Sequence, residues 1–211
     1  MKSKLLIILT ILCCLSNINA QNDHLEPVES VFDDLSYQYY TTVRKILFKG
    51  MSYRPEVRFV IIPSFSVEQV VAIEKSDDKY FIVHHKMEQS IWYTEEDPEK
   101  INVIKKKVEI PKKLAKLYKE LFLIAINNRK YPEVEIWGND GTNYYFTVYD
   151  SRLKTGMIWS PRPKSKMKRL EKIGYSLINL AYDTKKGAIA RPNKKLINEI
   201  KALTNELRSN K

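Results

Sequence analysis

Hydrophobic residues recur along this chain with two different periods, and the order of these periods constrains the fold more than any single motif does. Spacings of three and four residues are typical of amphipathic helices. They predict helices over residues 26–48, from Pro111 onward, from Pro163 onward and after Asn193, which can cap its helix. Apolar, β-branched runs bounded by turn residues predict strands. The expected strands cover residues 57–62, 70–74, 80–85, 91–94, 103–110, 134–137, 144–149 and 156–159.

The order of these elements is helix, strands, helix, strands, two helices. Strand runs joined by turns favour an antiparallel sheet, and the helices are then expected to cover one of its faces. The sequence therefore predicts an α+β fold with about six to eight antiparallel strands and about four helices. No long linker interrupts residues 21–211, so we expect a single domain there.

The first twenty residues have the layout of a secretory signal peptide rather than of a folded element. Lys2 and Lys4 precede an apolar run over residues 5–15, and a short polar stretch ends at the small residue Ala20. The run is shorter than the roughly 20 apolar residues that a membrane-spanning helix needs. We therefore expect cleavage after Ala20 and an exported protein, periplasmic or secreted, with no transmembrane segment in its mature chain.

Both cysteines, Cys13 and Cys14, lie inside this apolar run. A lipid-modified cysteine normally follows a small residue, whereas Leu12 precedes Cys13, so the sequence disfavours a lipoprotein anchor. The mature chain would then contain no thiol, which excludes disulfides, cysteine redox chemistry and cysteine metal sites. Its stability must come from a hydrophobic core, and 191 residues suffice to build one.

Positive charge is concentrated in the last third of the chain. Residues 21–151 contain 18 basic and 21 acidic side chains, whereas residues 152–211 contain 16 basic and 4 acidic ones. This asymmetry points to an acidic protein or an anionic envelope polymer as the partner, and nucleic acid is less favoured. The alternative is a lysine-rich surface that serves solubility alone.

The strongest candidate site surrounds the start of the third helix. Cations there oppose the helix dipole unless an anion is held, and Ser165 could cap this helix while free backbone N–H groups donate to the anion. Trp159 could stack on a sugar, a base or an arginine, and Arg162 or Arg169 could bind a carboxylate or phosphate bidentately. The candidate binding residues are Arg152, Trp159, Arg162, Lys164, Ser165, Lys168, Arg169 and Lys172.

The same residues have a simpler interpretation. Lys168 and Lys172 project opposite the apolar stripe of their helix and would then be solvated, and Trp159 would be a core residue at a strand end. Exposed charges near a helix start cost roughly a few tenths of a kcal/mol each, which a fold tolerates without any function.

Metal and cofactor chemistry finds little support in the sequence. His84 and His85 are adjacent in an expected strand, so their side chains should point to opposite faces and cannot grip one ion. His24 lies in the N-terminal tail of the mature chain, and no third ligand follows at zinc-like spacing. We therefore expect no metal site and no cofactor.

Two pairs of carboxylates suggest a hydrolase as the alternative function. Glu133 and Glu135 alternate on one strand face, and Asp140 and Asp150 bracket another strand. Glu135 or Asp150 could act as general acid or base on an envelope polymer if two carboxylates converge in a cleft. Turn formation and solvation explain the same residues, and nucleophile and phosphate-loop motifs are missing.

Aromatic residues on both faces of the expected strand 144–149 leave a further question open. Tyr144 and Phe146 should share one face, with Tyr145 and Tyr149 on the other. If helices cover one face only, the other set is exposed and resembles a binding surface. If helices cover both faces, both sets are buried.

The favoured function is that of an exported, soluble, non-enzymatic binding protein, similar in role to an inhibitor or an immunity protein. Its basic and aromatic C-terminal third would engage an acidic protein or an anionic envelope polymer. The carboxylate hydrolase is the alternative. A third helix lying on a membrane ranks last, because Gly174, Ser176 and Asn179 interrupt its apolar face.

Overall fold

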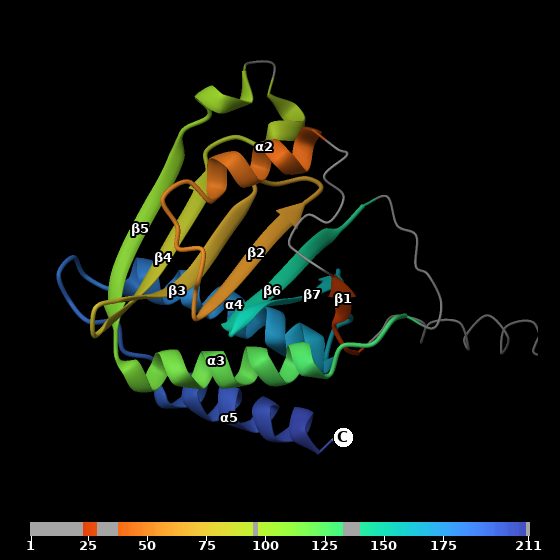
Figure 1. Ribbon diagram of the computed structural model, residues 1–211, viewed down its shortest axis with the longest axis vertical. Coiled ribbons are helices and arrows are strands. Elements are labelled where there is room, and N and C mark those ends of the chain that lie inside the picture. Colours follow the sequence, from red (N-terminus) through yellow and green to blue (C-terminus); the bar gives the residue numbers. More distant parts are fainter. Residues whose placement is uncertain (1–22, 29–37, 95–96, 133–139, 210–211) are drawn as a thin grey trace, which may run out of the picture.

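The computed structural model describes residues 23–28, 38–94, 97–132 and 140–209. They build an antiparallel sheet of seven strands in the order β1-β7-β6-β2-β3-β4-β5 (Figure 1). The strands are β1 (Glu26–Val28), β2 (Val57–Pro63), β3 (Gln69–Ser76), β4 (Lys79–Met87), β5 (Val103–Ile110), β6 (Thr142–Asp150) and β7 (Arg152–Trp159). The α+β class and the antiparallel sheet are confirmed, while the expected signal peptide and strand 134–137 lie outside the described residues.

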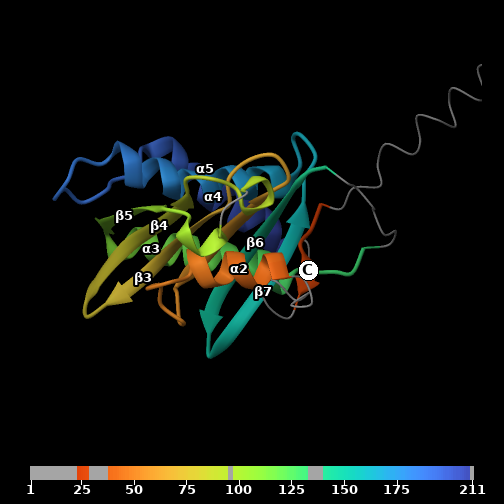
Figure 2. The same ribbon diagram turned by 90° about the horizontal axis from the view of Figure 1, so that it is seen from above.

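Helices lie on both faces of this sheet. α2 (Gln38–Leu47) covers one face, and α3 (Lys112–Asn127) and α4 (Lys166–Asp183) cover the other (Figure 2). α5 (Lys194–Arg208) packs against α3 and α4. The expectation that helices cover one face only is wrong, because α2 closes the second. None of the helices in the described part of the chain has the length and apolar character needed to cross a membrane.

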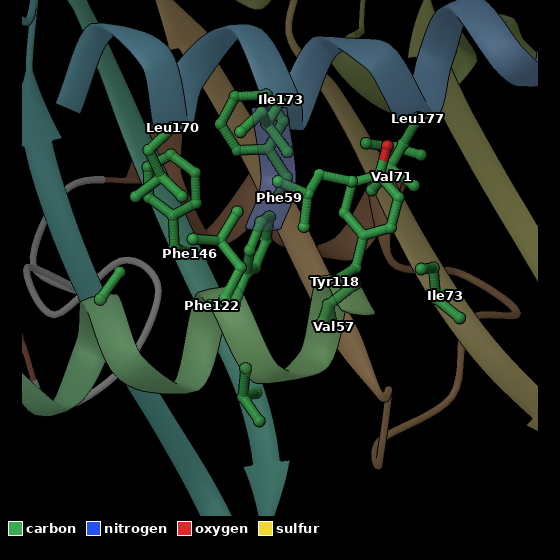
Figure 3. Packing of buried hydrophobic residues seen from close by; sticks show 14 of the residues in the cluster. Val57, Phe59, Val71, Ile73, Tyr118, Phe122, Phe146, Leu170, Ile173 and Leu177 are labelled. Atoms are coloured by element: carbon green, nitrogen blue, oxygen red, sulfur yellow. The ribbon is translucent and has the colours of Figure 1, made fainter. Parts of the chain in front are cut away.

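The larger hydrophobic core lies between the sheet and the helices α3 and α4 (Figure 3). Phe59 of β2 is fully buried, and its ring centroid lies 4.9 Å from that of Phe146 on the neighbouring strand β6. Phe122 from α3 and Ile173 from α4 belong to the same cluster. Since these residues come from four elements, this core fixes the position of α4 relative to the sheet.

A second core lies under α2. Tyr39, Val43 and Leu47 of the helix pack in one cluster with Val60 and Tyr145 of the sheet. Tyr144 and Tyr145 point to opposite faces of β6, and each is only 7% exposed. Tyr144, Tyr145 and Phe146 are therefore core residues on both faces rather than a binding surface, while Tyr149 is half-buried.

Helix starts follow the sequence closely, with one exception. α3, α4 and α5 begin directly after Pro111, Ser165 and Asn193, and the Asn193 side chain accepts a hydrogen bond from the Leu196 N–H. The helix expected over residues 26–48 is wrong at its start. Residues 26–28 form β1, which pairs with β7. The edge of β7 supplies hydrogen-bond partners for the backbone N–H groups of these residues, whereas the first N–H groups of a helix have no partner within the helix.

The strand expected over residues 91–94 is also wrong. Ile91–Tyr93 form a short 3-10 turn, η2, whose start is capped by Ser90. The Ser90 Oγ accepts a hydrogen bond from the Trp92 N–H at 3.3 Å. This local side-chain acceptor competes with strand pairing and favours the turn.

Candidate functional site

The chain between β7 and α4 has a fixed shape. The Ser165 hydroxyl donates to the Arg162 carbonyl oxygen at 2.8 Å and accepts from the Lys168 N–H at 3.0 Å. The prediction that Ser165 caps this helix is confirmed. Ser160 and Lys164 have φ values of 38° and 67°, in the left-handed region that non-glycine residues rarely adopt. The segment is therefore held by a cap and two turn positions.

Two of the candidate cations are paired inside the molecule. Lys168 Nζ lies 2.7 Å from the carboxylate of Glu171, which is itself 5% exposed. Arg169 binds two carboxylates of α5, with its Nε 2.7 Å from Glu199 and its Nη1 2.5 Å from Glu206. The hydrogen bond to Glu206 raises the pKa of Arg169. These pairs tie α4 to itself and to α5, so the two side chains have a structural role.

The remaining candidates do not form one site. Arg152 follows the β6–β7 turn, whereas Trp159 ends β7, so about 23 Å of strand separates them. Lys164 and Lys172 are exposed near the start of α4, and Arg162 is half-buried. Arg152 therefore stands apart from Trp159 and from the residues around the start of α4.

Trp159 lies against the first residues of β6. A Cβ atom on Gly141 would be only 2.3 Å from Trp159 Nε1, so this glycine allows the indole to approach the backbone. The Ser160 N–H donates to the Thr142 carbonyl oxygen, and the Thr142 N–H donates to the Ser160 Oγ, both at 2.9 Å. Trp159 is half-buried. It is therefore neither the fully buried core residue nor the fully exposed stacking residue that the two interpretations of the sequence describe.

Three exposed aromatic residues lie at the same end of the sheet. The Ser64 N–H donates to the Gly141 carbonyl oxygen at 2.8 Å, and the Tyr93 hydroxyl donates to the Ser64 carbonyl oxygen at 2.9 Å. These bonds link the loop after β2 and the turn η2 to the strand beneath Trp159. The aromatic residues are Phe65, Trp92 and Tyr93, which are 71%, 56% and 63% exposed.

We call Phe65, Trp92, Tyr93, Trp159, Arg162 and Lys164 the aromatic–basic end. Trp92 is held in place by stacking on Tyr39, with ring centroids 4.1 Å apart. Phe65 and Trp92 were not among the residues predicted to form a site. Phe65 could have been predicted, because it follows Pro63 and is flanked by serines in a turn, where an aromatic side chain cannot belong to the buried face of a strand.

A pocket of about 1130 Å³ lies on the α2 face of the sheet. The lining residues include no aspartate or glutamate. They include six cations, which are Arg44, Lys45, Lys49, Arg58, Lys100 and Lys105. No sequence pattern predicted this pocket. Its cations come from residues 44–105, within the part of the chain whose net charge is negative.

His84 and His85 point to opposite faces of β4, as expected from their adjacency. His84 is fully buried, its Nε2 lies 3.1 Å from Gln69 Oε1, and burial lowers its pKa to about 4. His85 Nδ1 lies 2.7 Å from the Leu47 carbonyl oxygen, and burial lowers its pKa as well. Both rings are neutral structural groups, and no group of three metal-ligating side chains gathers within the described ranges.

The carboxylates do not build a hydrolytic site in the described structure. Asp150 is solvent-exposed at its carboxylate, and its hydrogen bond with Lys154 lowers its pKa, the opposite of what a general acid needs. Asp140 and Asp150 stand at opposite ends of β6 and do not converge. Glu133 and Glu135 lie outside the described residues.

One buried carboxylate escaped the sequence analysis. Glu68 is fully buried, and its Oε1 accepts hydrogen bonds from the Tyr39 hydroxyl at 2.7 Å and the Ser90 hydroxyl at 3.1 Å. Burial raises its pKa. The network links α2 to the turn η2 beneath Trp92, so Glu68 supports the aromatic–basic end without being accessible to a substrate.

Comparison of this chain with protein-family models, with curated proteins and with solved structures finds no match.

Proposed function

We propose that this protein is an exported, non-enzymatic binding protein of the inhibitor or immunity type, and that its partner is an acidic protein. The aromatic–basic end is the surface that would engage this partner. The exposed Lys164 of this end and the exposed Lys172 of α4 would attract it. Arg162 and the aromatic side chains would supply contact area at the centre of the interface.

The observation that carries this proposal is the exposure of Phe65, Trp92 and Tyr93 at the end of the sheet where β2 ends and β6 begins. Each large aromatic side chain left in water forgoes about 1.5–3 kcal/mol of burial. The hydrogen bond from the Tyr93 hydroxyl to the Ser64 carbonyl oxygen brings the loop that carries Phe65 to the turn that carries Trp92 and Tyr93. Exposed aromatic side chains gathered in this way form a patch of the kind that marks interaction sites. Aromatic residues and arginine are the types enriched in protein–protein interfaces.

Charge supports an acidic partner. The last third of the chain has few acidic residues, and the structure pairs Glu171, Glu199 and Glu206 with only two cations, Lys168 and Arg169. The positive surplus is therefore carried by other side chains, including the exposed Lys164 and Lys172. Such a field accelerates encounter with an acidic partner and makes its association sensitive to salt.

Affinity capture with the mature chain, residues 21–211, tests the proposal. Bait protein is incubated with an envelope extract of the native organism. The site variant Lys164→Glu/Lys172→Glu changes the charge by the same amount as the control Lys185→Glu/Lys186→Glu, which lies at the other end of α4, and all four lysines are exposed. We expect one acidic protein to be retained by the wild type and the control.

The site variant should bind this protein at least about tenfold more weakly, because reversing two interface charges removes attraction and adds repulsion. Equal retention by all three baits would reject the aromatic–basic end as the binding surface. Retention of mixed anionic polymer in place of one protein would replace the proposed partner by a polymer.

A further inference from the structure

The cations of the pocket under α2 converge from several elements. Arg44 and Lys45 belong to the last turn of α2, where they also favour the helix dipole. Arg58 comes from the central strand β2, and Lys105 comes from the edge strand β5. The dipole explains the helical pair, but no such local effect explains a buried arginine in the middle of a sheet.

Arg58 is the unusual member of this set. It is 6% exposed, and its Nη2 donates to the Ser52 carbonyl oxygen at 2.5 Å. Its guanidinium carbon lies 4.5 Å from the centre of the Phe48 ring. Its Nε is buried and has no hydrogen-bond partner among the residues that the structure describes. A buried charged donor that lacks an acceptor is destabilising unless something supplies one.

The electrostatic surroundings of Arg58 favour an added anion. Burial lowers the pKa of Arg58 to about 10, with Glu74 opposing this shift and the positive charge of Arg44 adding to it. Glu74 Oε1 accepts from the Ser52 N–H at 2.7 Å and does not bond to the guanidinium. An anion beside Arg44 and Arg58 would relieve the repulsion between the two guanidinium groups.

Part of the remaining lining is apolar. Ile46, Phe48, Met51, Val103 and Leu153 contribute side chains to the pocket wall. A volume of about 1130 Å³ exceeds what an inorganic ion fills and suits a small organic molecule. The lining thus combines cations with an apolar wall, the complement of a molecule with a charged head and an apolar body.

We propose that this pocket binds a small amphiphilic anion, with its carboxylate or phosphate head at Arg58 and Arg44 and its apolar body along Phe48 and Met51. This site is separate from the aromatic–basic end. Arg58 lies near the start of β2, whereas Ser64 follows its end, and six residues of extended chain span about 20 Å.

Calorimetric titration of the mature protein with laurate and with dodecyl phosphate tests this site. Dodecanol supplies the apolar body without charge, and inorganic phosphate supplies the head alone. We expect one laurate or dodecyl phosphate per chain, and at least about tenfold weaker binding of dodecanol and of inorganic phosphate, because dodecanol lacks the charged head and inorganic phosphate lacks the apolar body. Tighter binding of one of the two anions identifies the head group.

Arg58→Met keeps an unbranched side chain, shorter than arginine, and removes the charge, and it should weaken the binding of both anions at least about tenfold. Because Arg58 is buried, its replacement can also destabilise the fold, so a second variant at an exposed position is needed. Arg44→Glu, at an exposed position that lines the pocket, should have the same effect, whereas Arg54→Glu, an equal charge change at an exposed position outside the lining, should not.

Equal affinity of laurate for the wild type and Arg44→Glu would overturn the proposal, as would equal affinity of dodecanol and laurate, or no detectable binding. The outcome is independent of the partner assigned above. Lys164→Glu/Lys172→Glu should bind laurate like the wild type.

Discussion

Gly174→Val should lower the free energy of unfolding by about 3 kcal/mol, measured by urea denaturation. A Cβ atom at residue 174 would lie 2.7 Å from the Cδ1 and Cε1 atoms of Phe59. Phe59 cannot move aside, because its ring is fully buried and packs against Tyr144 and Phe146 at centroid distances of 5.8 and 4.9 Å. Overpacking of this kind displaces side chains or backbone, and the two Cγ atoms of valine add to the clash made by its Cβ.

Asn179→Val in the same helix is the matched control. Asn179 is exposed, and asparagine and valine have similar helix propensities, so we expect a change within about 0.5 kcal/mol. A loss at Asn179 equal to that at Gly174 would show that the cost lies in helix propensity, and it would contradict the packing of α4 on Phe59.

Acidification from pH 6.5 to pH 4 should cost about 3 kcal/mol of stability through His84 alone. Burial lowers the pKa of His84 from 6.5 to about 4, so the folded state keeps the ring neutral while the unfolded chain takes up a proton. The contribution is therefore complete above the unfolded pKa and disappears as the pH falls towards the folded pKa. His85, whose pKa is also lowered, adds to the same trend.

The contribution of His84 is isolated by comparing two pH profiles. The free energy of unfolding of the wild type and of His84→Gln is measured by urea denaturation between pH 4 and pH 7. Glu68, whose pKa is raised, favours the folded state at low pH and opposes the trend in both proteins, so it cancels in the difference. The free energy of unfolding of His84→Gln should fall less steeply below pH 6.5 than that of the wild type. An equal fall in both proteins would mean that burial does not keep His84 neutral.

Local patterns predict much of this fold because the features they encode are local. The strand over residues 103–110 matches β5, and the caps Ser165 and Asn193 mark helix starts, since each signal depends on neighbours within a few residues. The start of the expected helix 26–48 fails for the opposite reason. Its residues pair with β7, about 130 positions away, and no local period reports that partner.

Gly174 shows how a pattern can be read in the wrong sense. In the sequence it interrupts an apolar helix face, whereas in the structure it is the point where α4 approaches Phe59 most closely. Periodicity gives the face of a helix that is buried, but it does not give the shape of the surface that the face meets.

The candidate site was predictable only in part. Ser165 and the cations near it could be read from a helix start, but Arg169 is bound by Glu199 and Glu206, which lie 30 and 37 residues further along the chain. Phe65 and Tyr93 reach the end of the sheet near Trp159 through contacts made by Ser64. The cluster of cations under α2 could not be predicted from the charge of residues 21–151, because acidic side chains elsewhere in this range outnumber the basic ones.

Photo-crosslinking at Phe65 tests the proposed partner surface most directly. Benzoylphenylalanine replaces Phe65 in one form of the mature protein and Tyr131 in another, because both positions are aromatic and strongly exposed, at 71% and 80%. Each form is irradiated in an envelope extract of the native organism. We expect one discrete adduct with an acidic protein from Phe65 and none from Tyr131. The same adduct from both positions, or no adduct from Phe65, would rule out this surface as the binding site.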